Sequence, residues 1–309
     1  MTYFMKSVRW PTFFLAVGFV FLWNSGFISA EYGLPYTKPY TLLFWRYWSL
    51  TFILLIYLFI RGGLHWPGFS IAIPTFIIGI LAHGVWQGCV FFSLQYGVPA
   101  GIVALVVALQ PMTTGALSGL MVGEPTPLHR WFGLIIGFFG VAIAVSARID
   151  QSDAQSVFFY LIPFGSVLAM TIAGLLQRRL EVYNQAPQMP VSLTLFYQSL
   201  ATAIAVTIPA IFLESLSTQW NLKFVGAMLW LIIALSFVAY AFMWRLIARM
   251  DATRVASLFY LGPPVTMVMA WIAFGDKLQP TDILGLIIVA AGVFLTQLEY
   301  GVSSCAEKI

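Results

Sequence analysis

The sequence predicts an all-α polytopic membrane protein, with ten transmembrane helices arranged as two inverted five-helix repeats. The first observation is composition, because 61% of the 309 residues are hydrophobic and only 8% are charged. The second is that the apolar residues occur in runs of about twenty, the length that a helix needs to cross a bilayer. The third is that the second half repeats the first at a fixed spacing.

The composition also excludes several classes of protein. A soluble globular chain carries about 25% charged residues, far more than this one. The net charge of +4 is spread over the connecting segments, whereas a nucleic-acid surface needs a clustered basic patch. Cys89 lies in an apolar run and Cys305 in the tail, so neither a disulfide nor a metal site is expected, and the sequence indicates no cofactor.

The ten apolar runs must be helical, because inside a bilayer the backbone has to satisfy its own hydrogen bonds. The first run follows Lys6 and Arg9, as in a signal peptide, but it is longer than the apolar core of such a peptide and is predicted to be retained. The expected spans are residues 10–30, 41–60, 71–94, 99–122, 128–147, 157–177, 192–213, 224–246, 254–274 and 281–298.

The basic residues predict the orientation of the chain, since cytoplasmic loops of membrane proteins are enriched in Lys and Arg. Arg46 lies within a span, and the other basic residues divide unequally between the two sides. The side that holds the N-terminus receives Lys6, Arg9, Arg61, Arg130, Arg178, Arg179, Arg245, Arg249, Arg254 and Lys308. The opposite side receives Lys38, Arg148, Lys223 and Lys277. Both termini are therefore predicted to lie in the cytoplasm, with the chain in a bacterial inner membrane.

The internal repeat has an offset of 152 residues, as from Pro111 to Pro263. Gly123 then aligns with Gly275, and Glu124 with Asp276. The stretch Leu43-Phe44-Trp45-Arg46 aligns with Leu195-Phe196-Tyr197-Gln198, and Gly133-Leu134-Ile135-Ile136 with Gly285-Leu286-Ile287-Ile288. Because each half has an odd number of spans, the second copy enters the membrane from the opposite side. Inverted repeats are a hallmark of secondary transporters, with the substrate site near the midplane.

Four motifs resemble those of the EamA family, in the drug/metabolite transporter superfamily. They are Trp23-Asn24-Ser25-Gly26-Phe27, Phe44-Trp45-Arg46-Tyr47, the Gly123-Glu124 turn and the Gly275-Asp276 turn. The resemblance covers nearly the whole chain, with repeats at residues 10–147 and 157–298. It implies a ten-helix carrier that works by alternating access and exports amino acids or other small metabolites.

The third span holds the strongest candidates for substrate contact. His83 and Gln87 lie four residues apart and so share a helix face, with Trp86 beside them. A polar side chain deep in a bilayer is costly and indicates function, and His83 could bind substrate or respond to protonation. Alternatively, His83 is a neutral histidine that hydrogen-bonds to a neighbouring helix.

Four more residues are candidates for the cavity: Arg46, Asn24, Gln110 and Tyr260. Arg46 offers a bidentate fork to a carboxylate, or it reaches an interface or caps carbonyls. The resemblance favours the structural role, since relatives carry an arginine here whatever they transport. Most other aromatic residues, such as Trp230, Tyr240 and Trp271, are expected to anchor the bilayer interface or to pack.

Prolines at matched positions predict breaks in two helices. Pro111 in the fourth span and Pro263 and Pro264 in the ninth each remove a backbone donor, and paired broken helices point to a transporter site. The alternative is that these prolines are simple kinks. Glu124 and Asp276 are expected to act as paired caps or gates at opposite faces of the membrane.

Together these features predict a secondary transporter that exports a small polar or amphipathic metabolite. An amino acid or derivative is the leading candidate. A nucleotide-sugar or sugar-phosphate substrate is less favoured, because a multiply anionic ligand would need several buried cations and Arg46 alone is available. With no acidic residue deep in any span, uncoupled or weakly coupled export is favoured. The expected partners are this substrate and the lipid bilayer, with a monomer or a homodimer both open. The alternatives are a non-transporting receptor or assembly subunit and, less favoured, a membrane-embedded enzyme, for which His83 has no catalytic partner.

Overall fold

The structure is a computed structural model that describes residues 10–123, 128–146, 154–182, 189–247, 249 and 258–297. Within these residues all regular structure is helical, apart from one isolated β-bridge between Thr37 and Thr218. Seven helices are long and apolar enough to cross a membrane, and three shorter apolar helices occupy the other predicted spans. The predicted all-α architecture is therefore confirmed.

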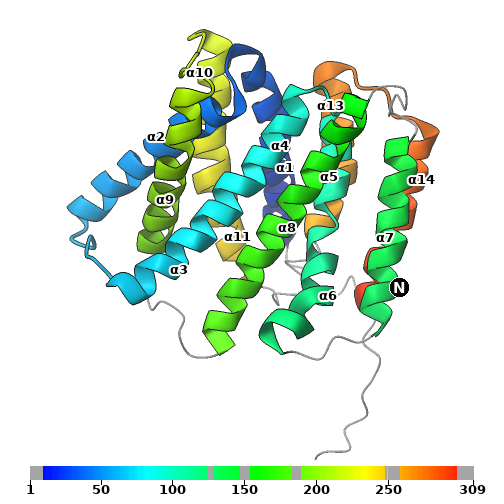
Figure 1. The fold of residues 1–309 in the computed structure, drawn as a ribbon, viewed down its shortest axis with the longest axis horizontal. Helices are drawn as coiled ribbons and strands as arrows, with labels where there is room; N and C mark the ends of the chain where they lie inside the picture. Colours follow the sequence, from blue (N-terminus) through cyan, green and yellow to red (C-terminus); the bar gives the residue numbers. More distant parts are fainter. Residues whose placement is uncertain are drawn as a thin grey trace, which may run out of the picture.

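The first half of the chain holds the first five spans, shown from blue to green in Figure 1. Its helices are α1 (Trp10–Gly33), η1 (Leu34–Tyr36), α2 (Pro39–Ile60), α3 (Phe69–Gly79), η2 (Ile80–Val85), α4 (Trp86–Gln95), α5 (Ala100–Val107), α6 (Gln110–Val122) and α7 (Leu128–Ser146). The third span is α3, η2 and α4 in succession, and the fourth is α5 and α6.

The second half holds the other five spans, in the colours from green to red. Its helices are α8 (Ala154–Val182), α9 (Val191–Phe212), α10 (Leu222–Leu229), η3 (Trp230–Ala239), α11 (Tyr240–Ile247), η4 (Phe259–Leu261), α13 (Gly262–Phe274) and α14 (Pro280–Gln297). The eighth span is α10, η3 and α11 in succession.

Helices that correspond in the two repeats pack against each other in antiparallel pairs. In the pair α2 and α9, Glu214 just after α9 binds the start of α2 at Thr41, while Tyr197 near the start of α9 donates to the His65 carbonyl beyond the end of α2. The pair α7 and α14 likewise runs in opposite directions along its length. The repeats are therefore inverted, as the odd number of spans in each half predicts.

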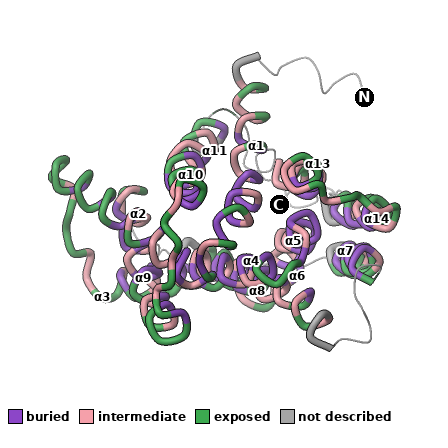
Figure 2. The backbone as a smooth tube through the Cα atoms, turned by 90° about the horizontal axis from the view of Figure 1, so that it is seen from above, coloured by how far each residue is buried: buried purple, intermediate pink, exposed green. Residues whose placement is uncertain are grey.

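Other helices also pack against helices of the opposite repeat. Helix α1 packs against η3 and α13 of the second repeat, and α8 packs against α4 and α6 of the first. Seen from above in Figure 2, buried residues gather where α1, α4, α5 and α8 meet, and the pair α7 and α14 stands at one edge. The centre of the molecule is thus enclosed by helices from both repeats.

Two kinds of helix irregularity recur at matched positions. A π-helical turn interrupts the third span at η2 and the eighth span at η3, and such turns are frequent at functional sites. The fourth span breaks between Val107 and Gln110, and the ninth contains a 3₁₀ turn directly before Gly262. The breaks precede Pro111 and Pro263, whose missing N–H groups prevent a continuous helix.

The outer surface is apolar, as expected of helices that face lipid. Large side chains such as Phe52, Phe139, Ile208 and Phe294 are more than half exposed. A soluble protein rarely presents apolar surface on this scale.

Candidate substrate site in a central cavity

A cavity lies at the middle of the bundle, between helices of both repeats. Water can reach a volume of about 50 Å³ within it, enough for a few water molecules. Its lining comes from α1, α2, η2, α4, α8, α9, η3 and α11: Trp23, Gly26, Phe27, Arg46, Tyr47, Leu50, Ala82, His83, Trp86, Gln87, Val90, Phe91, Met170, Leu195, Leu235, Ser236 and Tyr240. Four of the seven predicted substrate-contact residues are among them, namely Arg46, His83, Trp86 and Gln87.

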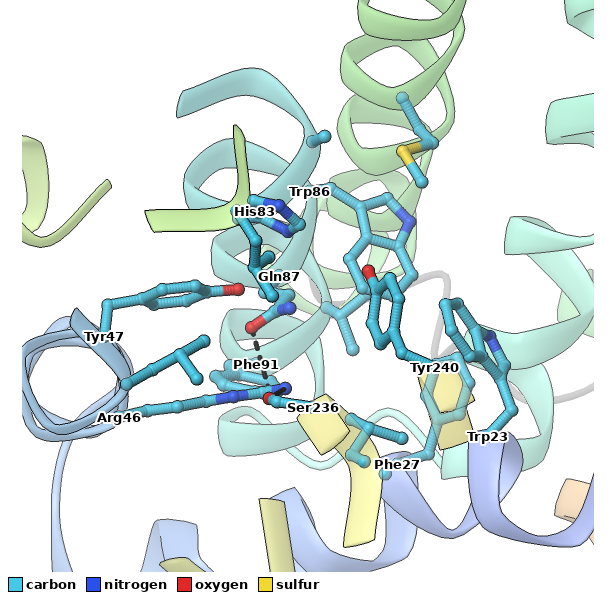
Figure 3. Close-up of a pocket in the computed structure, with 17 residues that line it drawn as sticks. Trp23, Phe27, Arg46, Tyr47, His83, Trp86, Gln87, Phe91, Ser236 and Tyr240 are labelled. Atoms are coloured by element: carbon cyan, nitrogen blue, oxygen red, sulfur yellow. Dashed lines mark hydrogen bonds between the residues drawn. The ribbon is translucent and has the colours of Figure 1, made fainter. Parts of the chain in front are cut away.

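Arg46 is the charged group of this cavity. Its side chain is only 3% exposed, and it extends from α2 toward α4 and η3 (Figure 3). Nη1 donates to Oε1 of Gln87 at 3.1 Å, and Nη2 donates to Oγ of Ser236 at 3.2 Å. The buried Nε has no hydrogen-bond partner. Arg46 therefore neither reaches the bilayer interface nor caps a carbonyl, which leaves its donors in the cavity.

His83 is held by the helix that corresponds to α2 in the second repeat. Its Nε2 lies 3.3 Å from Oε1 of Gln198 on α9, and its ring centroid lies 5.7 Å from that of Tyr47. With the amide so assigned, Nε2 carries the proton and Nδ1 is an acceptor. The predicted alternative of a histidine bonded to a neighbouring helix describes this contact, yet His83 also lines the cavity.

The two repeats make matching contacts across the cavity. Arg46 and Gln198 occupy equivalent positions in the repeat, and each reaches the π-helical turn of the other half, at Ser236 and at His83. The match is not exact, because the positions that correspond to His83 and Gln87 are Leu235 and Ala239. At these two positions the third span is therefore polar, where the eighth span is apolar.

Aromatic rings close the side of the cavity opposite Arg46. Trp23, Trp86 and Tyr240 stand there (Figure 3), and the Trp23 and Tyr240 ring centroids are 5.6 Å apart. Tyr240 thus faces the cavity and not the bilayer interface. Trp271 is 56% exposed on the outside of α13, and Trp230 donates to the Ser25 hydroxyl.

A second, smaller cavity adjoins the first and shares Trp23, Phe27 and Trp86 with it. Its lining collects most of the other predicted site residues at the breaks in the fourth and ninth spans: Trp23, Asn24, Phe27, Trp86, Ala104, Val107, Ala108, Gln110, Pro111, Phe259, Tyr260, Gly262 and Pro263. Asn24 is fully engaged, since Nδ2 donates to the Val20 carbonyl and Oδ1 accepts from the Thr266 hydroxyl. Its position is therefore fixed between α1 and α13.

Three predicted residues lie elsewhere. Pro264 follows Pro263 in the first turn of α13 but does not line either cavity. Asp276 lines a separate small pocket with Lys277 and Asp282, beyond the end of α13. Glu124 falls outside the described residues, so the proposed pairing of Glu124 with Asp276 is not visible.

Sequence reasoning missed Tyr47, Ser236 and Gln198. Gln198 had a signal, because it is the repeat counterpart of Arg46 and is polar within an apolar run. Ser236 had none, since a serine in an apolar helix commonly bonds its own backbone, as this one also does to the Leu231 carbonyl. Among the described residues that line either cavity there is no Asp or Glu, and no His/Cys/carboxylate cluster suited to a metal occurs in the described part of the chain.

Comparison with known proteins agrees with this architecture. The model of the EamA-like transporter family matches residues 10–146 and 157–298. The chain belongs to the EamA-like transporter family. The protein is accordingly a multi-pass membrane transporter of the drug/metabolite transporter superfamily, and family membership indicates a carrier and not an enzyme.

Several relatives align over most of their length with this EamA-like chain. An uncharacterized transporter of Archaeoglobus fulgidus is 26% identical over 284 residues, with 89% of this chain and 93% of the relative covered. A probable amino-acid metabolite efflux pump of Salmonella typhimurium is 22% identical over 309 residues, covering 95% and 97%. One solved crystal structure has the same fold, with a TM-score of 0.61 at 17% identity, covering 94% of this chain and 97% of that one.

Proposed function

We propose that this EamA-like protein exports a small amphipathic metabolite that carries a carboxylate, of the amino-acid class or its derivatives, by alternating access. The observation that carries the proposal is the buried Arg46 in a cavity whose described lining has no acidic side chain. A buried cation is costly unless it is paired, and a carboxylate is the group that a guanidinium binds best.

The rest of the cavity fits an amphipathic molecule. Gln87, His83 and Ser236 surround the guanidinium with polar groups, while Leu50, Met170, Leu195 and Leu235 offer apolar surface. The printed name of the Salmonella typhimurium relative, a probable amino-acid metabolite efflux pump, supports the same class.

Alternating access follows from the geometry of the cavity. Its water-reachable volume of about 50 Å³ is smaller than ordinary pockets for small molecules, which measure about 300–1,000 Å³. Substrate therefore needs the surrounding helices to part. Inverted repeats supply this motion when one rocks against the other around a midplane site. The basic residues favour an orientation in a bacterial inner membrane with both termini on the cytoplasmic side. Export then moves substrate from the cytoplasmic side, where the termini lie, to the opposite side of the membrane.

The test is counterflow in liposomes that contain the purified protein and a panel of small carboxylates. Arg46→Gln removes the charge, and Arg46→Lys keeps the charge but removes the planar fork. The matched control is Arg61→Gln, because Arg61 is exposed and stacks over Tyr57 outside the cavity. A hydrogen bond to a charged group contributes about 1.5–3 kcal/mol, so we expect Arg46→Gln to weaken substrate binding about 10- to 100-fold.

Two companion variants address the rest of the site. His83→Ala and Gln87→Ala should also reduce counterflow, while size-exclusion profiles and melting temperatures show that they fold. Unchanged transport in all three cavity variants would reject this site. Absence of any counterflow from the unmodified protein would instead favour a receptor or an assembly subunit.

A further inference from the structure

The described lining of the two central cavities carries one fixed charge, and that charge is positive. Arg46 supplies it, and none of the other lining residues is acidic. Carboxylates of the described chain, such as Glu31, Glu214, Asp276 and Asp282, lie at helix ends outside both linings. A ligand that enters the cavity therefore meets a cation with no acidic neighbour.

A carboxylate and an ammonium group would fare very differently in this cavity. The guanidinium still has an unpartnered buried Nε and can donate further hydrogen bonds to an oxyanion. An ammonium group needs acceptors, but Oε1 of Gln87 and Oγ of Ser236 already accept from Arg46, and Nδ1 of His83 is a single uncharged acceptor. An ammonium group would also be repelled by Arg46 in a medium of low dielectric.

Resting on the proposed function, we propose that the substrate is a monoanion: an amphipathic carboxylate without a free ammonium group, such as a 2-oxo acid or an N-acylated amino acid. Its body lies against Leu235, Met170 and Leu195, and its carboxylate lies at Arg46, Gln87 and His83. This assignment narrows the amino-acid class to derivatives in which the amine is removed or blocked.

The charge of the substrate also supplies a driving force. In a full transport cycle Arg46 returns to its starting place, so the net charge moved is that of the substrate. A membrane that is negative inside drives a monoanion outward, and 100 mV shifts its equilibrium distribution about 50-fold. A zwitterion has no net charge and gains nothing from the potential. Export of a monoanion thus needs no acidic ion-coupling site.

The experiment measures charge per substrate in liposomes that contain the full-length protein. A potassium gradient with valinomycin sets about −100 mV inside, and matched probes are leucine, N-acetylleucine and 4-methyl-2-oxopentanoate, with a second set built on phenylalanine. Protein-free liposomes give the background. We expect the two blocked forms to accumulate outside about 50-fold at this potential and the parent amino acids to show no such shift. The final ratio does not depend on which way the protein is inserted.

A charge variant provides a second readout. Gln87→Glu places a carboxylate against Nη1 of Arg46, where the amide oxygen now lies at 3.1 Å, and neutralises the cavity with almost no change in shape. We expect it to lose binding of the anionic probes, measured by their effect on melting temperature, while it remains folded. Ligand binding to the native state raises that temperature, so the loss is visible without transport.

The outcomes separate this inference from the proposed function. Arg46-dependent transport of the parent amino acids, without transport of the blocked forms, overturns the monoanion assignment and leaves the carboxylate carrier intact; the rings of Trp23, Trp86 and Tyr240 would then hold the ammonium group. If the blocked forms are transported but their distribution does not respond to the membrane potential, the inference that the potential drives export is wrong. If no probe moves in an Arg46-dependent way, both proposals fail.

Discussion

Two side chains hold the Arg46 guanidinium in place, Gln87 of the same repeat and Ser236 of the other repeat. Ser236 is the most informative of them, because its Oγ accepts from Arg46 and donates to the Leu231 carbonyl five residues earlier. That spacing belongs to the π-helical turn η3, which brings the hydroxyl toward the cavity. In a cavity of low dielectric each further polar group that loses its partner is costly.

Replacing Ser236 by alanine should therefore destabilise the protein and weaken substrate binding. The change leaves an Arg46 N–H without its partner, at a cost of about 1–3 kcal/mol, so the apparent melting temperature in detergent should fall. The matched control is Ser199→Ala on α9, because the Ser199 hydroxyl is fully buried with no hydrogen-bond partner. Its removal should leave the melting temperature unchanged or raise it. Equal losses in both variants would show that the Arg46 contact contributes nothing.

Residue types and spacing predicted four residues that line the central cavity, Arg46, His83, Trp86 and Gln87, but not the hydrogen bonds that they make. His83 and Gln87 stood out because they are polar and share a helix face, and both line the cavity. The contact between His83 and Gln198 joins positions 115 residues apart in the chain, and no local pattern reports such a distance. The sequence could not distinguish Tyr240, which lines the cavity, from aromatic residues at the bilayer interface, since aromatic residues of both kinds occur in apolar runs.

At the level of helices, glycines set how closely α7 and α14 approach. A Cβ on Gly285 would lie 2.6 Å from the Gly140 carbonyl oxygen, and one on Gly292 would lie 2.6 Å from the Gly133 carbonyl oxygen. Because the blocking atoms are backbone, no side-chain rotation could relieve the clash. Helices in membranes associate through such close packing, so this pair depends on its small residues.

We expect Gly285→Ala and Gly292→Ala to destabilise the protein by about 1–3 kcal/mol, the range for overpacked cores. The matched control is Gly174→Ala in α8, where a Cβ would meet nothing within 4 Å. Alanine is the better helix former by about 1 kcal/mol, so this control should be neutral or stabilising. Melting curves of the three purified variants decide the matter, and a stability of Gly285→Ala at or above that of Gly174→Ala would contradict the packing argument.

The apolar runs in the sequence predicted where the helices lie. The irregularities inside the helices could be predicted only in part. The prolines predicted the helix breaks before Pro111 and Pro263, because the missing backbone N–H is a local property of proline. The π-helical turns at Ile80–Val85 and Trp230–Ala239 carry no proline or charge that marks them. Both turns pack against helices of the other repeat, α8 and α9 on η2 and α1 on η3, and such contacts between distant segments leave no local pattern in the sequence.

At the level of the whole molecule, the two repeats are joined at one end by the segments that follow η1 and α9. Thr37 and Thr218 form an antiparallel bridge, and their hydroxyl oxygens lie 3.3 Å apart. Glu214 accepts from the backbone and hydroxyl of Thr41 at the start of α2. The distribution of basic residues predicts that this end faces away from the cytoplasm. Because each contact crosses between the repeats, the cavity can open on this side only if the contacts part.

A disulfide between Thr37→Cys and Thr218→Cys should therefore stop transport. Residues opposite each other in an antiparallel bridge have Cα atoms about 4.5–5.5 Å apart, within the range that a disulfide spans. The background removes the native thiols by Cys89→Ala and Cys305→Ala. Oxidation of the double-cysteine protein in liposomes should abolish counterflow, and reduction should restore it, because locking this end prevents the outward-open state. Each single cysteine variant is the control and should be insensitive to oxidant. Full transport by a protein that is completely cross-linked would mean that substrate leaves by a route that does not separate these segments, and rocking of the two repeats about the Arg46 cavity would be wrong.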